Sequence, residues 1–396
     1  MLRNGRRWWA GAVAVALAVG IGGRATAEAP PADDGELLRR IAAMGSIEPD
    51  WVTPAARRQL TPELIATVMS QLGEAAGPFE AVAPEGDGWL LLFENASVPV
   101  LLSRDENGLV AGLFFREPIP NDLTLDEVVG AIAALPGETA VYVARGDTVL
   151  AAHAADAPLL VASSFKLAVM LALREAVDAG DLAWDQVVRY RSDWASVSSG
   201  MLHAYPDGHP ITVASLAAMM ISLSDNTATD VLIRLVGRDH VEAAAGTAPI
   251  LMTAEYFKLK ADPALYRRYL DADLAGQRAI IEEIGAVPLP RQADLANGRI
   301  AHGWRLSARS LCALMGAVAD LGEMGINTGG QPSVEWDRIA FKGGNDVGVT
   351  NLTYMVTPPG GMPVCLSMTW NEPGHFDDAT FNSLAGQLLH VLRAGG

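Results

Sequence analysis

The sequence predicts a mixed α+β (α/β) protein in two folded parts: a small α+β domain, then a larger domain whose antiparallel sheet is flanked by helices and accompanied by an all-α lobe. Three observations predict this fold class. Two helical segments near the N-terminus precede a meander of short strand-like runs, a proline-containing segment without periodicity follows, and strand-like runs flank a long helical block in the rest of the chain. Strands at both ends of such a block imply one sheet assembled from distant segments.

Residues 1–27 have the pattern of an export signal. Arg3, Arg6 and Arg7 form a basic start, an apolar run covers residues 8–22, and Ala25-Thr26-Ala27 matches a cleavage site. We therefore expect cleavage after Ala27 and a periplasmic or secreted mature protein without stable membrane insertion. The alternative is an uncleaved membrane anchor.

Composition and charge narrow the classes of partner. The chain has 396 residues and is 50% hydrophobic, which is ample for buried cores, and no tandem repeat or low-complexity tract is present. Removal of residues 1–27 takes away four arginines and no acid, so the net charge falls from −17 to −21. Such a negative charge argues against nucleic acid or anionic lipid as a partner.

The first domain is predicted over residues 34–120. Residues 34–45 have a helical pattern, and a second helix begins at Thr61-Pro62-Glu63, where a capping threonine precedes a proline in the first turn, and runs to about Glu74. Strand-like runs with turn signals between some of them follow at 78–84, 88–95, 98–105 and 108–115. Helices followed by an antiparallel meander indicate a small α+β domain.

Residues 116–123 are predicted to be a linker, and the second domain is predicted over residues 124–396. Thr124 and Glu127 form a capping box that opens a helix to about Leu135. Two strands joined by a turn at Gly146-Asp147 come next, and a mostly helical stretch then extends to about residue 322. The expected closing elements are strands at 339–344, 352–358 and 363–370 and a helix at 377–393.

The two cysteines are predicted to be buried free thiols. Cys312 lies in a helical pattern and Cys365 in a strand-like one. A disulfide is the open alternative, because an exported protein can oxidise such a pair. The sequence contains no C-x-x-C or H-E-x-x-H motif, so we expect no metal and no cofactor.

A serine and a lysine three residues apart open an apolar helical pattern in the segment LVASSFKLAVMLALREA. Positions i and i+3 share a helix face, so Lys166 can reach the hydroxyl of Ser163. A hydroxyl becomes a good nucleophile only when a base takes its proton, and a lysine that is desolvated or close to other cations can do this. The alternative is a serine N-cap followed by a surface lysine.

Two further motifs bear on this site. Ser224-Asp225-Asn226 follows an apolar helix, where a second hydroxyl can relay a proton and an amide can orient a substrate; the alternative is a helix cap. Lys342-Gly343-Gly344 ends a strand, where a cation can bind a carboxylate and glycines let a substrate lie against the strand edge; the alternative is a turn.

The order Ser-x-x-Lys, Ser-Asp-Asn, Lys-x-Gly resembles class A β-lactamases and penicillin-binding proteins. Residues 124–393 resemble that family, and residues 211–237 resemble its helix–loop–helix almost throughout. The resemblance implies the β-lactamase/transpeptidase-like fold. Segments 198–212, 248–261 and 303–312 look like a subgroup of serine hydrolases associated with clavulanate biosynthesis. In that subgroup the first domain resembles the cone of ketosteroid isomerase and nuclear transport factor 2, which residues 34–120 fit in a structural or interaction role.

The catalytic roles implied by the resemblance fall on four residues. Ser163 would be the acylated nucleophile and Lys166 the general base. Ser224 would pass a proton to the leaving group, and Lys342 would supply positive potential to Ser224 and to a substrate carboxylate.

The binding roles follow from the same resemblance. Asn226 would contact the substrate amide and Lys166, and Gly344 would let the substrate lie against the strand. The backbone N–H groups of Ser163 and Asn345 would form the oxyanion hole.

The sequence departs from the family at two positions. Between Asn226 and residue 322 there is no Glu-x-x-x-Asn motif, which positions the deacylating water in class A enzymes. Glu255 is the nearest acid to its place, and we interpret it as a helix-capping or surface residue; the alternative is a catalytic role. Residues 263–284 look like an inserted helical stretch. Gly343 replaces the family's threonine or serine, which removes a hydroxyl that would bind a substrate carboxylate.

The sequence therefore predicts an exported serine hydrolase that forms an acyl-Ser163 intermediate on a small-molecule β-lactam, ester or amide substrate. One alternative is an esterase or a D-alanyl-D-alanine carboxypeptidase that uses the same residues. Another is a β-lactam-binding or scaffold protein with slow turnover.

Overall fold

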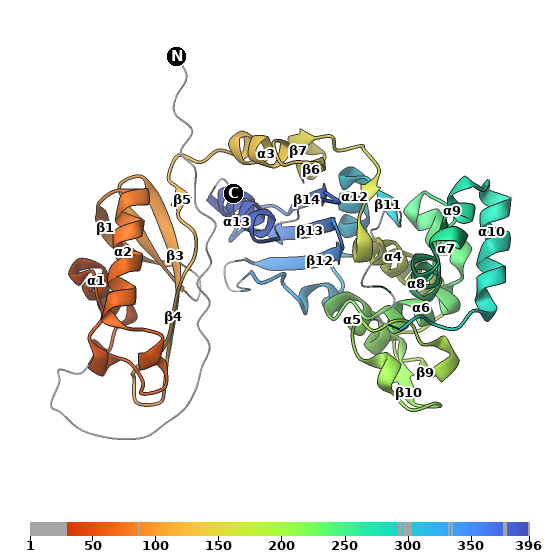
Figure 1. The fold of residues 1–396 in the computed structure, drawn as a ribbon, viewed down its shortest axis with the longest axis horizontal. Coiled ribbons are helices and arrows are strands. Elements are labelled where there is room, and N and C mark those ends of the chain that lie inside the picture. The colour runs from red at the N-terminus through yellow and green to blue at the C-terminus, as the bar shows by residue number, and fades with distance from the viewer. Residues whose placement is uncertain are drawn as a thin grey trace, which may run out of the picture. The chain divides into compact units, whose positions relative to one another are not determined.

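A computed structural model describes residues 30–394 except for 86–87, 292–294, 296–302, 332, 334–335 and 375–377. The signal peptide expected at residues 1–27 lies outside this part of the chain. The chain divides into two compact units. The first comprises the described residues up to Val128 together with Asn382–Val391, and the second comprises Val129–Phe381 and the chain from Leu392 onward (Figure 1).

The first unit is an antiparallel sheet with two helices. Thr61 caps the second helix by accepting a hydrogen bond from the Leu64 N–H. Leu37, Ile41 and Phe93 are buried in the hydrophobic core of this unit. The strand order is β1-β2-β3-β4, with β5 paired to β3. The helices are α1 Asp34–Met44, η1 Pro49–Trp51, η2 Ala56–Arg58 and α2 Pro62–Ala76; the strands are β1 Phe79–Glu85, β2 Gly88–Phe93, β3 Ala96–Arg104, β4 Val110–Phe115 and β5 Ile119–Pro120.

The segment expected to be a linker contains part of this sheet. Ile119 and Pro120 pair with Ser97 and Ala96, so the expectation of an unstructured 116–123 segment is wrong at β5. A proline is compatible with a strand at the edge of a sheet, where its missing N–H leaves no ladder bond unmade.

The second unit is built around a five-stranded antiparallel sheet of order β12-β13-β14-β6-β7 (Figure 1). Thr124 and Glu127 form the predicted reciprocal cap of α3, whose helix leads into the first strand. Helix α12 packs on β14, β13 and β6. The elements are β6 Glu138–Arg145, β7 Thr148–His153, α12 Ala308–Val318, η7 Gly322–Gly325, β12 Arg338–Asp346, β13 Val349–Thr357 and β14 Val364–Asn371. Helices α3 Leu125–Ala133 and α13 Asp378–Ala394 each have residues in both units.

A helical lobe completes the second unit, centred on the apolar helix α4, which is buried against α6, α7 and α12. The predicted helical insertion forms α9 and α10. The lobe contains η3 Ala162–Phe165, α4 Lys166–Asp178, η4 Ser192–Trp194, η5 Leu202–Ala204, α5 Val213–Ser222, α6 Asn226–Val236, α7 Arg238–Ala245, α8 Thr253–Ala261, α9 Pro263–Asp271, α10 Leu274–Glu283 and η6 Ile284–Ala286, with the short strand pairs β8 Leu159–Leu160 with β11 Arg305–Leu306 and β9 Val187–Arg189 with β10 Pro210–Thr212.

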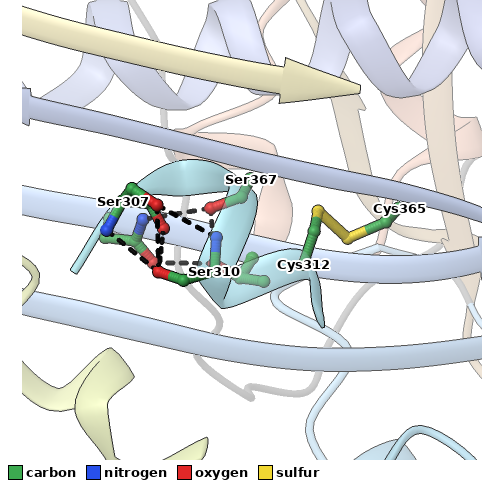
Figure 2. Close-up of a disulfide and its surroundings, with 7 residues drawn as sticks. Ser307, Ser310, Cys312, Cys365 and Ser367 are labelled. Carbon is green, nitrogen blue, oxygen red and sulfur yellow. Dashed lines mark hydrogen bonds between the residues drawn. A yellow bond between two sulfur atoms is a disulfide. The ribbon is translucent and has the colours of Figure 1, made fainter. Parts of the chain in front are cut away.

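A disulfide joins Cys312 of α12 to Cys365 of β14 (Figure 2). The expectation of two free thiols is therefore wrong: the face of α12 that packs on the sheet brings Cys312 to within 5.8 Å of Cys365, Cα to Cα. Helix and strand patterns predict burial separately and cannot show that the two buried faces meet. A bridge across a separation of 53 residues restricts the unfolded chain enough to stabilise the fold by about 4 kcal/mol in the loop-entropy account.

The expected fold class is confirmed: an antiparallel sheet flanked by helices and an all-α lobe follow a small α+β unit. Among the described helices, none is both long enough and apolar enough to cross a bilayer.

Candidate active site

The nucleophile segment is a tight turn leading into α4. Ala162 has a left-handed φ of 44° and starts the 3₁₀ turn η3, which presents Ser163 partly exposed while Ser164 beside it is buried. The Phe165 ring stacks on the Trp304 ring with centroids 4.0 Å apart, and this packing holds the turn in place. A non-glycine residue in this conformation costs on the order of 1–3 kcal/mol, and such strain is concentrated at functional sites.

Lys166 lies fully buried one turn after Ser163. Its Nζ donates to the Ser224 carbonyl oxygen at 2.6 Å, to the Ser224 Oγ at 3.2 Å and to the Asn226 Oδ1 at 2.8 Å. The Asn226 amide N–H₂ donates to the Val197 carbonyl at 3.2 Å. The amide is thereby oriented with its oxygen toward the lysine, while the N–H₂ that the resemblance assigns to a substrate is bonded within the protein.

The Ser224 hydroxyl lies between two lysines. Lys342, on β12, also donates to the Ser224 Oγ, at 3.1 Å, and to the Gly343 carbonyl. Ser224 has a left-handed φ of 54°, so the Ser-Asp-Asn turn carries the same kind of strain as the nucleophile turn. The structure thus brings three of the four predicted catalytic side chains into one hydrogen-bonded chain, beside the turn that carries Ser163.

Burial tunes both lysines toward the neutral form. Desolvation, followed by the nearby charge of Lys342, lowers the pKa of Lys166 well below its usual 10.5. Desolvation lowers the pKa of Lys342 to about 7. A lysine with a lowered pKa gives up its proton more readily than an exposed lysine, and the resulting amine can accept a proton from a hydroxyl.

The Asp225 carboxylate holds the Ser-Asp-Asn turn in place through hydrogen bonds. It accepts hydrogen bonds from the Ala228 N–H at 2.9 Å, which caps α6, and from the Met201 and Leu202 N–H groups at 2.7 and 2.8 Å. A Cβ at Gly200 would lie 2.3 Å from the Asp225 Oδ2, so only glycine permits this approach. The Ser-Asp-Asn motif therefore combines its predicted capping role with the placement of Ser224 and Asn226.

The β12 edge closes against the nucleophile turn at Gly344. A Cβ at this position would lie 2.1 Å from the Val161 carbonyl oxygen and 2.9 Å from the Ser163 nitrogen. Asn345, the next residue, pairs with Thr350 in the sheet and lines the same cavity as Ser163. The two N–H groups expected to form an oxyanion hole thus lie on segments in van der Waals contact.

Gly343 faces an aromatic ring. A Cβ there would lie 2.9 Å from the Phe341 Cζ, and the Phe341 ring packs on Tyr354 with centroids 4.6 Å apart. The position where the family carries a hydroxyl is therefore next to an apolar edge.

The Glu255 carboxylate forms hydrogen bonds that stabilise the start of α8. It binds both terminal nitrogens of Arg238, at 2.6 and 3.0 Å, and accepts the Met252 N–H at 2.7 Å at the start of α8. These bonds agree with the interpretation of Glu255 as a capping residue. Asp230, buried beside it, accepts the Thr253 and Ala254 N–H groups, and burial raises its pKa to about 6.

A cavity of about 380 Å³ opens over Ser163. Sequence reasoning missed three of its residues: Tyr256 and Lys260, one turn apart on α8, and Asp346, the last residue of β12. The Asp346 carboxylate accepts the Tyr256 hydroxyl at 2.9 Å and the Lys260 ammonium at 2.8 Å. Two features of the sequence could have indicated these residues. Tyr256 and Lys260 have the i, i+4 spacing of one helix face, and Asp346 lies two residues after Gly344. Within the described ranges, no group of three or more His, Cys, Asp or Glu side chains is arranged to hold a metal ion.

Comparisons with known proteins bear on this site. Residues 124–250, which include Ser163, Lys166 and the Ser-Asp-Asn turn, match the model of the Beta-lactamase enzyme family. A comparison with curated proteins finds no match.

The chain is similar in fold to several solved β-lactamase structures. A β-lactamase from Sphaerobacter thermophilus is 24% identical with a TM-score of 0.47, covering 69% of this chain and 96% of its own. A class A β-lactamase from Mycobacterium abscessus is 20% identical with a TM-score of 0.46, covering 69% and 100%. A β-lactamase from Burkholderia vietnamiensis is 18% identical with a TM-score of 0.45, covering 70% and 98%.

Proposed function

We propose that this protein is an exported serine hydrolase that acylates Ser163 and acts on small cyclic amides of the β-lactam class or on esters. The observation that carries the proposal is the Ser224 hydroxyl held between two buried lysines, 3.2 Å from Lys166 and 3.1 Å from Lys342, beside the strained turn of Ser163. The family match over residues 124–250 supports the reaction class. The Cys312–Cys365 disulfide supports an oxidising compartment, as expected for an exported protein.

In the acylation step, the neutral amine of Lys166 takes the proton of the Ser163 hydroxyl as Oγ attacks the substrate carbonyl carbon. The N–H groups of Ser163 and Asn345 bind the oxygen on which negative charge develops. Ser224 passes its proton to the leaving nitrogen or oxygen as the acyl bond breaks and is reprotonated by the Lys342 ammonium, while Lys166 keeps the proton that it took from Ser163. The product is an ester of Ser163.

Ester substrates are the second candidate, and the environment of Gly343 favours them. Gly343 has no hydroxyl to donate a hydrogen bond to a substrate carboxylate, and the nearest side chain to this position is the apolar Phe341 ring. A hydrogen bond to a charged group contributes about 1.5–3 kcal/mol, so its loss lowers affinity for anionic β-lactams more than for neutral esters.

The test compares three probes on the mature chain: a fluorescent penicillin, a chromogenic cephalosporin and a p-nitrophenyl ester. We expect covalent labelling by the penicillin and turnover of at least one chromogenic probe, both lost in Ser163→Ala. Ser164→Ala is the matched control, because the buried Ser164 hydroxyl makes no hydrogen bond within the described structure and its removal should leave labelling intact.

Labelling or turnover that persists in Ser163→Ala would overturn the mechanism. Ester cleavage without β-lactam cleavage selects the esterase, and release of D-alanine from a D-alanyl-D-alanine peptide selects the carboxypeptidase. Stable labelling without turnover of any probe selects the slowly turning-over β-lactam-binding protein.

A further inference from the structure

Hydrolysis of an acyl-Ser163 ester needs a group that activates water, and the described residues that line the cavity over Ser163 supply one carboxylate. Among the described residues that line it, Asp346 is the only acid; the others are apolar, aromatic, hydroxyl or amide side chains and Lys260. Glu255 is unsuited, because it does not line the cavity.

Asp346 lines the cavity over Ser163 and lies on the same face of β12 as Lys342. Side chains alternate along a strand, so Lys342, Gly344 and Asp346 share one face. Lys342 reaches the Ser224 hydroxyl from this face, and a Cβ at Gly344 would lie 2.9 Å from the Ser163 nitrogen. Asp346 follows two residues later, about 6.6 Å along the strand. Asp346 and Ser163 line the same cavity of about 380 Å³, which is large enough to hold water molecules.

Three donors fix the carboxylate. Lys260 and the Val347 N–H donate to Oδ1, both at 2.8 Å, and the Tyr256 hydroxyl donates to Oδ2 at 2.9 Å. Oδ2 retains a free acceptor site for a water proton. Tyr256 is itself held between Asp346 and the Trp304 ring, whose centroid is 4.7 Å from its own, so the carboxylate is positioned by rigid aromatic packing.

The other groups in the cavity are weaker candidates for the base. Burial and the Asp346 charge raise the pKa of Tyr256 well above 10, so its phenol remains a donor. Lys166 accepts the serine proton during acylation and is an ammonium when the ester has formed, so it is ready to return that proton and cannot take another.

We propose that Asp346, positioned by Tyr256 and Lys260, is the general base for deacylation, in place of the Ω-loop glutamate that this sequence lacks. The inference rests on the proposed function. The Asp346 carboxylate takes a proton from a water molecule as the water oxygen bonds to the ester carbon. The tetrahedral intermediate then collapses: the bond from carbon to the Ser163 Oγ breaks, Oγ takes a proton from the Lys166 ammonium, and the product leaves as an acid.

The test separates the two steps kinetically with the chromogenic probe that the wild-type protein hydrolyses. When deacylation limits turnover, kcat reports deacylation and kcat/KM reports acylation. We expect Asp346→Asn to lower kcat about 100-fold, a typical contribution of a general base, with KM falling in parallel and kcat/KM changed by less than about threefold. Intact-mass spectra should then show the acylated protein accumulating at steady state.

Asp346→Glu keeps the carboxylate but moves it by one methylene; we expect kcat between those of the wild-type protein and Asp346→Asn, and this variant decides the question if Asp346→Asn does not fold. Asp337→Asn is the matched control, because Asp337 immediately precedes β12 at the strand end opposite Asp346, and its Oδ2 accepts the Gly360 N–H at 2.8 Å. It should behave as wild type.

Unchanged kcat in Asp346→Asn would overturn the proposal, as would a kcat/KM that falls as far as kcat, which indicates damage to acylation. Absence of acylation in the wild-type protein overturns the proposed function itself, and the labelling experiment detects this before any Asp346 variant is made.

Discussion

Two clusters near Ser163 contain buried lysines that have different partners; one lies at the Ser224 turn and the other lines the cavity over Ser163, and we refer to them as the two ends of the site. At one end Lys166 and Lys342 share the Ser224 hydroxyl, and their hydrogen-bond partners in the described structure are all neutral oxygens. At the other end Lys260, only 7% exposed at its side chain, pairs with the Asp346 carboxylate at 2.8 Å.

The difference teaches how one residue type serves two purposes. A buried cation close to another cation is destabilised in its charged form, so its proton becomes available for transfer. A buried cation beside a carboxylate stays charged and orients its partner through a strong hydrogen bond. We therefore interpret one end of the site as the proton-transfer end and the other as the end that positions a carboxylate.

Removing one lysine from each end tests the comparison most strongly. We expect Lys166→Met to slow covalent labelling of Ser163 by the fluorescent penicillin about 10³-fold, because the base that takes the serine proton is lost. Lys260→Met should change the labelling rate by less than about threefold, since Lys260 acts on Asp346 and not on Ser163. Stopped-flow labelling rates measure both, and similar losses in the two variants would break the comparison.

The pH dependence should show a smaller effect from Lys342. Its pKa of about 7 means that the cation is lost as the pH rises above 7, so attraction for a substrate carboxylate decreases. Between pH 6 and pH 9 we expect kcat/KM for an anionic cephalosporin to fall about tenfold relative to that for a neutral p-nitrophenyl ester, the equivalent of about 1.5 kcal/mol.

Taking the ratio of the two substrates removes the effect of Lys166, whose deprotonation accelerates acylation of both as pH rises. Parallel alkaline limbs for the two substrates would show that Lys342 does not bind the carboxylate.

The smallest effect concerns Gly343, next to the proton-transfer end. We expect Gly343→Ser to raise kcat/KM for the anionic cephalosporin about fivefold, less than a full charged hydrogen bond provides, because the Phe341 ring must shift to admit the new side chain. Gly343→Ala introduces the same crowding without a hydroxyl and is the control. A gain of equal size in both variants would mean that the hydroxyl is not responsible.

Short motifs were sufficient to predict which residues meet at the Ser224 turn. Ser163, Lys166 and the Ser-Asp-Asn turn are local patterns whose chemistry depends on residue type and spacing, and the strand edge at Lys342 completes them. The layered architecture followed from strand-like runs at both ends of a helical block. The short strand β5 was missed because two residues, one of them proline, carry too little periodicity to indicate pairing with β3.

The other end of the site was beyond sequence reasoning because it depends on how α8 packs against β12. Nothing in the local pattern around Tyr256 and Lys260 shows that Asp346, 86 residues after Lys260, accepts their hydrogen bonds. The same limit explains the cysteines, since each was predicted to be buried but their proximity comes from α12 packing on β14. In both cases the missing information is the register between two elements rather than the identity of either.

The contact at Gly344 has a consequence for how the site can change over evolution. With 2.1 Å between a Cβ and the Val161 carbonyl oxygen, any side chain would push the strand away from the nucleophile turn. We therefore expect position 344 to tolerate only glycine, whereas position 343 and the residues that line the cavity can change more freely. Under the proposed function, substrate preference can therefore diverge among descendants of this chain while the spacing of the two amides proposed to bind the oxyanion is retained.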